Sequence, residues 1–194
     1  MPFVFKRLAL FLSITAAFAA DKEGPAFRPP AASSFEHRQT NDKVTIGVES
    51  YAFGEKIKAA FGKLDPYSYG VLPVLVVIQN DSGQTIRVDR LRAEYVGPDR
   101  VRVTATPAKE VRYTRGVQNP TVARSPISIK KKNPLDAWEI EGRALVVELL
   151  PPGQSAGGFL YFKTDIGKGA SIYLNGLSEA GSGRELFYFE MPLE

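Results

Sequence analysis

Residues 70–89 of the sequence read GVLPVLVVIQNDSGQTIRVD and contain the pattern that decides the fold. The first half is an unbroken apolar run, and in the second half apolar and polar residues alternate from Ile86 to Asp89. Alternation with a period of two is typical of a strand that has one face toward solvent. Residues 80–83, Asn-Asp-Ser-Gly, are types that favour a tight turn. The stretch therefore predicts a hairpin of two strands in an antiparallel β protein.

Further strands and one helix are predicted around this stretch. Residues 53–62, FGEKIKAAFG, place Ile57, Ala60 and Phe61 on one helical face, and Gly62 is placed for a C-cap. Residues 74–78 are apolar on both faces, so the short helix, anchored by Phe61, is expected to cover the face turned away from the main core. Strands are predicted at residues 44–50, 74–78, 86–89, 91–95, 101–105, 144–150, 158–162, 171–177 and 186–191. A turn at residues 97–100 is expected to join 91–95 and 101–105 as a second hairpin, and another turn is predicted at residues 151–153.

Seven to nine short strands at roughly ten-residue spacing predict an all-β fold, an antiparallel immunoglobulin-like β-sandwich with one short helix. The strands differ in length and one connection is long, which favours a sandwich over an up-and-down barrel. A lipocalin-like barrel remains the alternative.

The first nineteen residues have the pattern of a signal peptide. Lys6 and Arg7 precede an apolar run over residues 8–16, and the small residues Ala17 and Ala19 match the cleavage rule. We predict a signal peptide at residues 1–19, a flexible leader at 20–42 and the sandwich domain at 43–194. An uncleaved N-terminal anchor is the alternative. The protein is expected to be exported to the periplasm or the extracellular space, with no transmembrane segment in the mature chain.

Composition excludes several classes of protein. The 194 residues include no cysteine, which excludes disulfides, thiol chemistry and the acylated cysteine of a bacterial lipoprotein. The 25 basic and 21 acidic residues give a net charge of +4, and cleavage after Ala19 would reduce it to +2. A nucleic-acid partner is not expected at so small an excess of positive charge.

Two segments, FGEKIKAAFGKLDPYSYGVLPVLVVIQNDSGQTIRVD and LLPPGQSAGGFLYF, resemble a group of uncharacterised exported bacterial proteins with an immunoglobulin-like sandwich. In that group a short helix ending in Phe-Gly precedes a strand of the form Pro-Val-x-Val-Val-Ile-x-Asn. A proline-glycine turn leads into a Gly-Phe-Leu-x-Phe strand. The resemblance implies the fold and export, and it implies no activity. Members are often lipoproteins, but this chain lacks the cysteine that such anchoring needs.

The sequence offers little catalytic chemistry. His37 is the only histidine, which argues against a Ser-His-Asp triad and nearly all zinc sites. A calcium site near Asn80, Asp81 and Asp89 is better explained by turn chemistry. A carboxylate-based hydrolase needs two carboxylates at a defined separation, and no pair stands out among Glu49, Asp65, Asp81 and Asp99. We therefore predict no enzyme activity, no cofactor and no metal.

Aromatic residues offer two further candidates. Tyr67 and Tyr69, on a loop stiffened by Pro66, are suited either to bind a sugar or to cap the core beside the helix, and capping is favoured. Trp138, the only tryptophan, is expected to pack at the end of the sandwich.

The densest positive charge lies in a long irregular loop at residues 108–134. Such a loop is generally functional or mobile, and its basic residues could contact an anionic partner or simply be solvated. The candidate contacts are Arg112, Arg115, Arg124, Lys130, Lys131 and Lys132.

The sequence thus predicts a non-enzymatic, exported cell-envelope module that acts by binding or assembly, with an envelope protein or an anionic envelope polymer as partner. A carbohydrate- or anionic-surface-binding domain that uses the basic loop is the first alternative, an adaptor that binds by β-augmentation is another, and a carboxylate-based hydrolase is the last.

Overall fold

The computed structural model describes residues 27–111, 135 and 138–193, and these form eleven strands, two α-helices and three 3-10 turns. The strands are β1 (His37–Asn41), β2 (Val44–Ser50), β3 (Leu72–Asn80), β4 (Ile86–Arg87), β5 (Arg92–Val96), β6 (Arg102–Thr104), β7 (Leu149–Leu150), β8 (Ser155–Phe162), β9 (Ser171–Asn175), β10 (Ser178–Glu179) and β11 (Phe189–Pro192). The helices are α1 (Glu55–Phe61) and α2 (Trp138–Gly142), and the 3-10 turns are η1 (Ala32–Ser34), η2 (Tyr67–Tyr69) and η3 (Ala108–Glu110).

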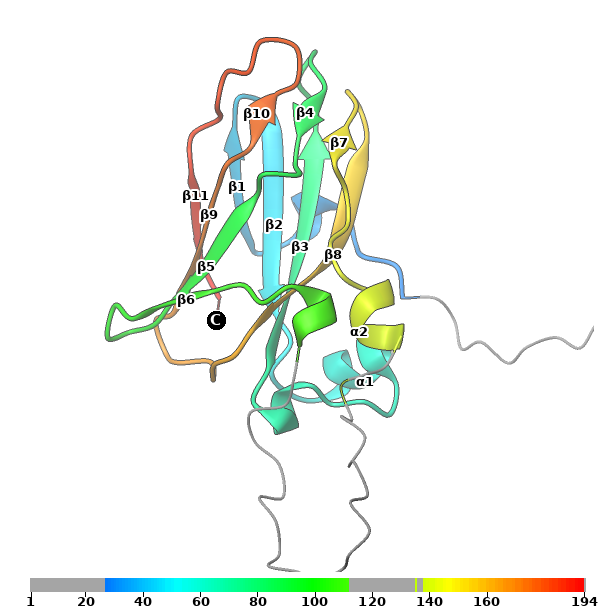
Figure 1. The fold of residues 1–194 in the computed structure, drawn as a ribbon, viewed down its shortest axis with the longest axis vertical. Helices are drawn as coiled ribbons and strands as arrows, with labels where there is room; N and C mark the ends of the chain where they lie inside the picture. Colours follow the sequence, from blue (N-terminus) through cyan, green and yellow to red (C-terminus); the bar gives the residue numbers. More distant parts are fainter. Residues whose placement is uncertain (1–26, 112–134, 136–137, 194) are drawn as a thin grey trace, which may run out of the picture.

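The strands form three sheets in which every pair of neighbours is antiparallel. Two four-stranded sheets have the orders β1-β2-β3-β8 and β11-β9-β5-β6, and a small sheet has the order β10-β4-β7. The small sheet lies at one end of the molecule and both α-helices lie near the other (Figure 1). The predicted all-β antiparallel class is confirmed. The immunoglobulin-like assignment stays a prediction.

The described residues contain two strands more than the seven to nine predicted, β1 and β10. The two residues of β10 are too few to show a periodic pattern. α2 is a second helix beside the one that was predicted, and its five residues are also too short for a periodic signal.

The core has two parts, one on each face of β3. Val74, Val76 and Ile78 point into the space between the two large sheets, and Leu75 and Val77 point to the opposite face. The main core also contains residues of the second large sheet, namely Ala93, Tyr95, Ile172, Leu174, Phe189 and Met191. The prediction that residues 74–78 are buried on both faces is therefore confirmed.

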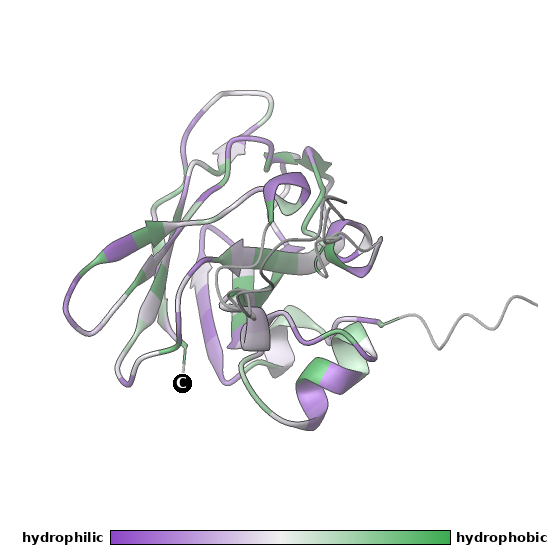
Figure 2. Cartoon of the chain, turned by 60° about the horizontal axis from the view of Figure 1, so that its bottom comes forward, coloured by the Kyte–Doolittle hydropathy of each residue, from purple (hydrophilic) through white to green (hydrophobic). Residues whose placement is uncertain are grey.

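Helix α1 provides the predicted cover on the outer face of β3. Ile57, Ala60 and Phe61 are buried in the same cluster as Leu75. Gly62 ends the helix with a positive φ of 64°, and its N–H donates to the carbonyl of Lys58 at 2.8 Å. Figure 2 shows hydrophobic and hydrophilic residues interspersed along the helices and strands. The helix and its role were thus predicted correctly.

The hairpin predicted at residues 70–89 does not form, because β3 and β4 belong to different sheets. Both edges of β3 are already paired, one with β2 and the other with β8. The polar turn instead carries the chain from a large sheet to the small one. The hairpin predicted between residues 91–95 and 101–105 is confirmed as β5 and β6.

Asn80 fixes this crossing, because its buried side chain joins two separate connections between sheets. Nδ2 donates to the carbonyls of Gln84 and Leu150 at 2.9 and 2.8 Å. Oδ1 accepts hydrogen bonds from the backbone N–H and the hydroxyl of Ser82 at 3.0 and 2.6 Å. The predicted turn at residues 151–153 is the second connection, and Gly153 there donates its N–H to the carbonyl of Asn80.

The predicted flexible leader at residues 20–42 extends too far along the chain. β1, within this range, pairs with β2, so the domain begins before Lys43. Residues 29–35 also pack on the large sheet, where they fill the space over two strand glycines. A Cβ on Gly47 would lie 2.6 Å from the ring of Phe35, and one on Gly157 would lie 3.0 Å from Pro29.

The first and last described strands lie side by side. The backbone N–H of Glu190 donates to Oε1 of Gln39 at 2.9 Å, and Nδ2 of Asn41 donates to the carbonyl of Tyr188, also at 2.9 Å.

The strand predicted at residues 144–150 is shorter in the structure. Only Leu149–Leu150 forms β7, and Ala144 makes an isolated parallel bridge to Phe159.

Candidate functional site

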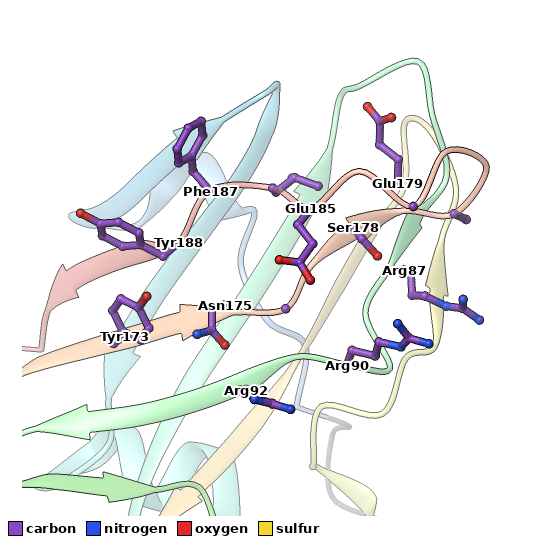
Figure 3. Close-up of a pocket in the computed structure, with 14 residues that line it drawn as sticks. Arg87, Arg90, Arg92, Tyr173, Asn175, Ser178, Glu179, Glu185, Phe187 and Tyr188 are labelled. Carbon is purple, nitrogen blue, oxygen red and sulfur yellow. The ribbon is translucent and has the colours of Figure 1, made fainter.

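A groove of about 520 Å³ lies on the outer face of the sheet β11-β9-β5-β6, next to the small sheet. We call it the arginine groove. Figure 3 shows its aromatic side chains at one end and its arginines toward the other. Its lining consists of Arg87, Arg90, Arg92, Tyr173, Asn175, Gly176, Ser178, Glu179, Ala180, Gly183, Glu185, Leu186, Phe187 and Tyr188.

Strand alternation provides the floor of the groove. Ile172 and Leu174 of β9 are buried in the main core, so Tyr173 and Asn175 point to the outer face. On the neighbouring strand β5, Arg92 is exposed and is paired in register with Asn175. The same alternation that builds the core thus places an amide and a guanidinium side by side outside it.

Three arginines form the basic part of the groove. Nε of Arg87 lies 3.1 Å from a carboxylate oxygen of Asp89, which is its ion-pair partner. Within the part of the chain that the structure describes, the side chains of Arg90 and Arg92 make no hydrogen bond or ion pair. Two guanidinium groups are therefore available to an anionic ligand, since each presents a planar set of N–H donors.

Gly176 holds the backbone of Arg90 against the end of β9. It has a positive φ of 85°, and a Cβ at this position would collide with the carbonyl oxygen of Arg90. No residue with a side chain fits this approach. The glycine thus allows Arg90 to lie at the edge of the groove.

The other end of the groove is aromatic. The rings of Tyr173 and Tyr188 stack with centroids 5.2 Å apart and an interplanar angle of 28°. The guanidinium of Arg102 lies 5.2 Å from the centroid of Tyr173, on the same outer face. Tyr188 is 50% exposed and Phe187 is 74% exposed. Aromatic surface that is left outside the core in this way is available for contact with a ligand.

Residues 177–188 form the wall of the groove. Arg184 donates to Glu179 at 2.6 Å and to Asp42 at 2.9 Å, which ties this segment to the turn between β1 and β2. The hydrogen bond from Arg184, followed by one from Ser182, lowers the pKa of Glu179. Glu185 points into the space between the arginines and the tyrosines (Figure 3).

A second hollow of about 640 Å³ lies near the helices and is more apolar. The guanidinium of Arg143 lies 5.9 Å from the ring centroid of Phe27 and 5.5 Å from that of Trp138. Trp138 is 66% exposed, so the prediction that it packs at the end of the sandwich is wrong. It begins α2, and the buried residue of that helix is Ile140. The basic residues of this hollow are Lys58, which forms an ion pair with Glu55, Lys63, and Arg143, which is stacked on aromatic rings.

The six basic residues predicted to contact an anionic partner lie outside the described residues, and their role stays a prediction. They are Arg112, Arg115, Arg124, Lys130, Lys131 and Lys132.

Tyr67 and Tyr69 are half-buried and pack against the core, as the capping interpretation predicts. Tyr67 also accepts a hydrogen bond from the backbone N–H of Ile166 at 3.3 Å.

The four acidic residues considered for hydrolysis have other roles. Asp65 accepts from the N–H of Ser68 at 3.1 Å, and Asp99 accepts from the N–H of Val101 at 3.1 Å. Asp81 accepts from Gln79, and Glu49 forms an ion pair with Lys56. Among the described residues, no three His, Cys, Asp or Glu side chains are grouped so as to hold a metal ion.

The sequence reasoning missed the arginine groove, although parts of its signal are visible. Arg87 and Arg92 fall on the polar faces of predicted strands, and Tyr173 alternates with Ile172 and Leu174. What the sequence does not show is that β9 pairs with β5 and with β11, which brings these side chains together.

No protein-family model and no curated protein matches the chain. Among solved structures, it is similar to a candidate lipoprotein, ycdA, from Bacillus subtilis, with 15% identity and a TM-score of 0.39. That match covers 80% of this chain and 38% of the other, so the chain spans about two fifths of the length of the Bacillus protein. It is also similar to a protein of unknown function from Listeria monocytogenes, with 14% identity, a TM-score of 0.39 and 80% of each chain covered. No argument about function is drawn from matches at these scores.

None of the described helices has the length and apolar character needed to cross a membrane.

Proposed function

We propose that this protein is a non-enzymatic, exported binding module of the cell envelope and that the arginine groove is its binding surface. The observation that carries the proposal is the pair of unpartnered guanidinium groups, Arg90 and Arg92, in the same groove as two stacked tyrosines. Charged and aromatic side chains on the solvent face of a sheet contribute little to the core. Their gathering in one hollow favours recognition of a ligand.

Glu179, in the wall of the groove, is not suited to act as the general acid of a hydrolase. A general acid in glycoside hydrolysis needs a raised pKa. Arg184 has the opposite effect on Glu179 and lowers its pKa. Export is supported by the pattern of residues 1–19.

The proposal is tested by titrating the purified protein, in a calorimeter, with an acidic polysaccharide, a neutral polysaccharide and anionic phospholipid vesicles. The groove variant carries Arg90→Gln and Arg92→Gln together. The matched control is Arg100→Gln, an exposed arginine in the turn between β5 and β6. We expect at least one probe to bind, with weaker binding by the groove variant and unchanged binding by the control. If no probe binds in a groove-dependent way, the proposed binding surface is wrong.

A second measurement on the same samples addresses activity. The polysaccharides are incubated with the protein and assayed for new reducing ends. We expect none above the level of a heat-inactivated sample, and steady release that is lost on mutation of Glu179 or Glu185 would show an enzyme instead.

A further inference from the structure

We propose that the arginine groove binds an acidic polysaccharide in which a sugar that carries a carboxylate adjoins an uncharged sugar. This inference rests on the proposed function and names the class of ligand. It is argued from the two ends of the groove and from the carboxylate between them.

The basic end provides the site for the carboxylate. Arg90 and Arg92 have no partner among the described residues, and Arg87 is paired with Asp89. A guanidinium group can donate two parallel N–H bonds to one carboxylate, which fixes the orientation of the acid as well as attracting its charge. Gly176, which has no Cβ, lets the backbone of Arg90 lie close to the end of β9.

The aromatic end provides the site for the uncharged sugar. Tyr188 is stacked on Tyr173 and half-exposed, so a ring surface with a hydroxyl at its edge remains open. The C–H face of a pyranose can pack on such a ring while its hydroxyls stay hydrated. Phe187, which is 74% exposed, extends this apolar surface.

The two ends are separated along the sheet. Tyr173 and Asn175 lie two residues apart on the same face of β9, which is a distance of about 7 Å, and Arg92 is the neighbour of Asn175 on β5. The arginines and the tyrosines thus occupy different parts of the groove (Figure 3). Two adjoining sugar rings can therefore occupy the two ends together.

Glu185 determines which order of sugars fits. It points into the space between the two ends, above Asn175 (Figure 3). Its carboxylate and the amide of Asn175 can bond the hydroxyls of an uncharged sugar. A second acid at this point would be repelled by the like charge. The groove should therefore favour a polymer with alternating charge over one that carries an acid on every unit.

The shape of the site favours a polysaccharide over a phospholipid headgroup. A lipid surface is contacted by basic side chains that protrude together from one face. Here the arginines share a groove with Glu179 and Glu185, and the segment 177–188 forms its wall. A narrow, mixed-charge groove suits an extended chain better than a flat anionic surface.

The test compares four probes by calorimetry at low salt. They are hyaluronan oligosaccharides, in which uronate and N-acetylhexosamine alternate, oligoalginate, in which every unit is a uronate, neutral dextran, and vesicles of phosphatidylglycerol. We expect hyaluronan oligosaccharides to bind most tightly and their affinity to fall as salt is raised.

Point variants then assign the two ends of the groove. Arg90→Gln and Arg92→Gln are each expected to weaken binding about tenfold, the effect of losing one charge-assisted contact. Tyr188→Leu should weaken it about fivefold, whereas Tyr188→Phe, which keeps the ring, should stay within about twofold. Arg100→Gln is the unchanged control. Circular dichroism verifies that each variant is folded.

Glu185→Gln tests the charge pattern. It should bring the affinity for oligoalginate toward that for hyaluronan oligosaccharides, because the repelling carboxylate is gone. Groove-dependent binding that is tightest to dextran, to oligoalginate or to vesicles in the unmodified protein overturns this inference and leaves the proposed binding surface standing. Absence of groove-dependent binding to every probe overturns the proposed function itself.

Discussion

Replacing Asn80 by alanine is expected to destabilise the protein more than any other single polar change among the described residues. The side chain is fully buried and its amide uses both N–H donors and both acceptor positions. Its partners lie at two different connections between sheets, so the conformation of both connections depends on this one side chain. Alanine removes all four hydrogen bonds and leaves the carbonyl of Leu150 without its side-chain donor.

The magnitude follows from the number of bonds. A typical intramolecular hydrogen bond contributes about 1 kcal/mol net, which gives a loss of about 4 kcal/mol for four bonds. Ser82→Ala is the matched control, because it removes the 2.6 Å bond to Oδ1 and two longer, exposed bonds to the backbone of Gln84, and it keeps Asn80 in place. We expect this variant to lose only about 1–2 kcal/mol.

Urea denaturation followed by far-ultraviolet circular dichroism is the assay. Tryptophan fluorescence is less suitable because the only tryptophan, Trp138, is 66% exposed in the native state. A loss below about 1 kcal/mol for Asn80→Ala, with an unchanged denaturant slope, would refute the assignment of Asn80 as the link between the two connections.

Asn80→Asp adds a test that depends on pH. One carboxylate oxygen would face the carbonyls of Gln84 and Leu150, which repel it, and burial penalises its charge as well. The folded-state pKa of this aspartate should therefore rise above its unfolded value. The destabilisation should be full above the folded-state pKa and should shrink as the pH falls and the carboxyl becomes protonated.

Three further changes probe other parts of the fold. Gly158→Ala should cost about 1–3 kcal/mol in urea denaturation, because the new Cβ would lie 2.5 Å from the backbone of Leu145. Phe61→Ala should cost about 3–5 kcal/mol in the same assay, since it empties the anchor of α1 over the outer face of β3. The lowered pKa of Glu179 means that its ion pair with Arg184 stabilises the groove wall above the unfolded pKa and that this contribution is lost as the pH falls through the folded value. The protection of the amides of residues 177–186, measured as the exchange rate relative to the intrinsic rate at the same pH, should therefore fall below about pH 4.5, and less so in Arg184→Gln.

Controls distinguish these effects from general damage. Gly83→Ala should be nearly neutral, because nothing lies within 4 Å of its new Cβ, and a large loss there would undermine the argument for Gly158. Phe53→Ala removes an aromatic ring that is 70% exposed and should cost less than Phe61→Ala. Equal protection factors at pH 3 and pH 6 in residues 177–186 would contradict the role of Glu179.

Local patterns predicted local structure well. The positions of Ile57, Ala60 and Phe61 and the glycine after them were enough to place α1, because helix periodicity and capping are properties of neighbouring residues. The turn between β5 and β6 was predicted for the same reason. Arg100, with a φ of 65°, and the N–H of Gly97, which donates to the carbonyl of Val101, complete it.

Pairing between distant strands could not be predicted in the same way. The Asn-Asp-Ser-Gly sequence at residues 80–83 fits both a hairpin and a crossing between sheets, and the choice depends on whether β2 and β8 already occupy the edges of β3. The arginine groove has the same origin. Arg92 and Asn175 are 83 positions apart, and only their register across β5 and β9 makes them neighbours.

The packing of residues 29–35 on the large sheet also had a signal, although an indirect one. Gly47 lies in the interior of β2, and Gly157 lies in the interior of β8. A glycine inside a strand often marks the close approach of another segment. Here the segment is residues 29–35, whose proline and phenylalanine gave no periodic pattern of their own.

The contact between β1 and the residues around β11 has a consequence for how the chain reaches its native state. The two hydrogen bonds that join them connect residues 151 and 147 positions apart. Native pairings over such separations close slowly, because the entropy of a large loop is lost before the contacts form. The ribosome has to release the residues up to Glu190 before this seam can close, so the contact between β1 and the residues around β11 forms only late in synthesis.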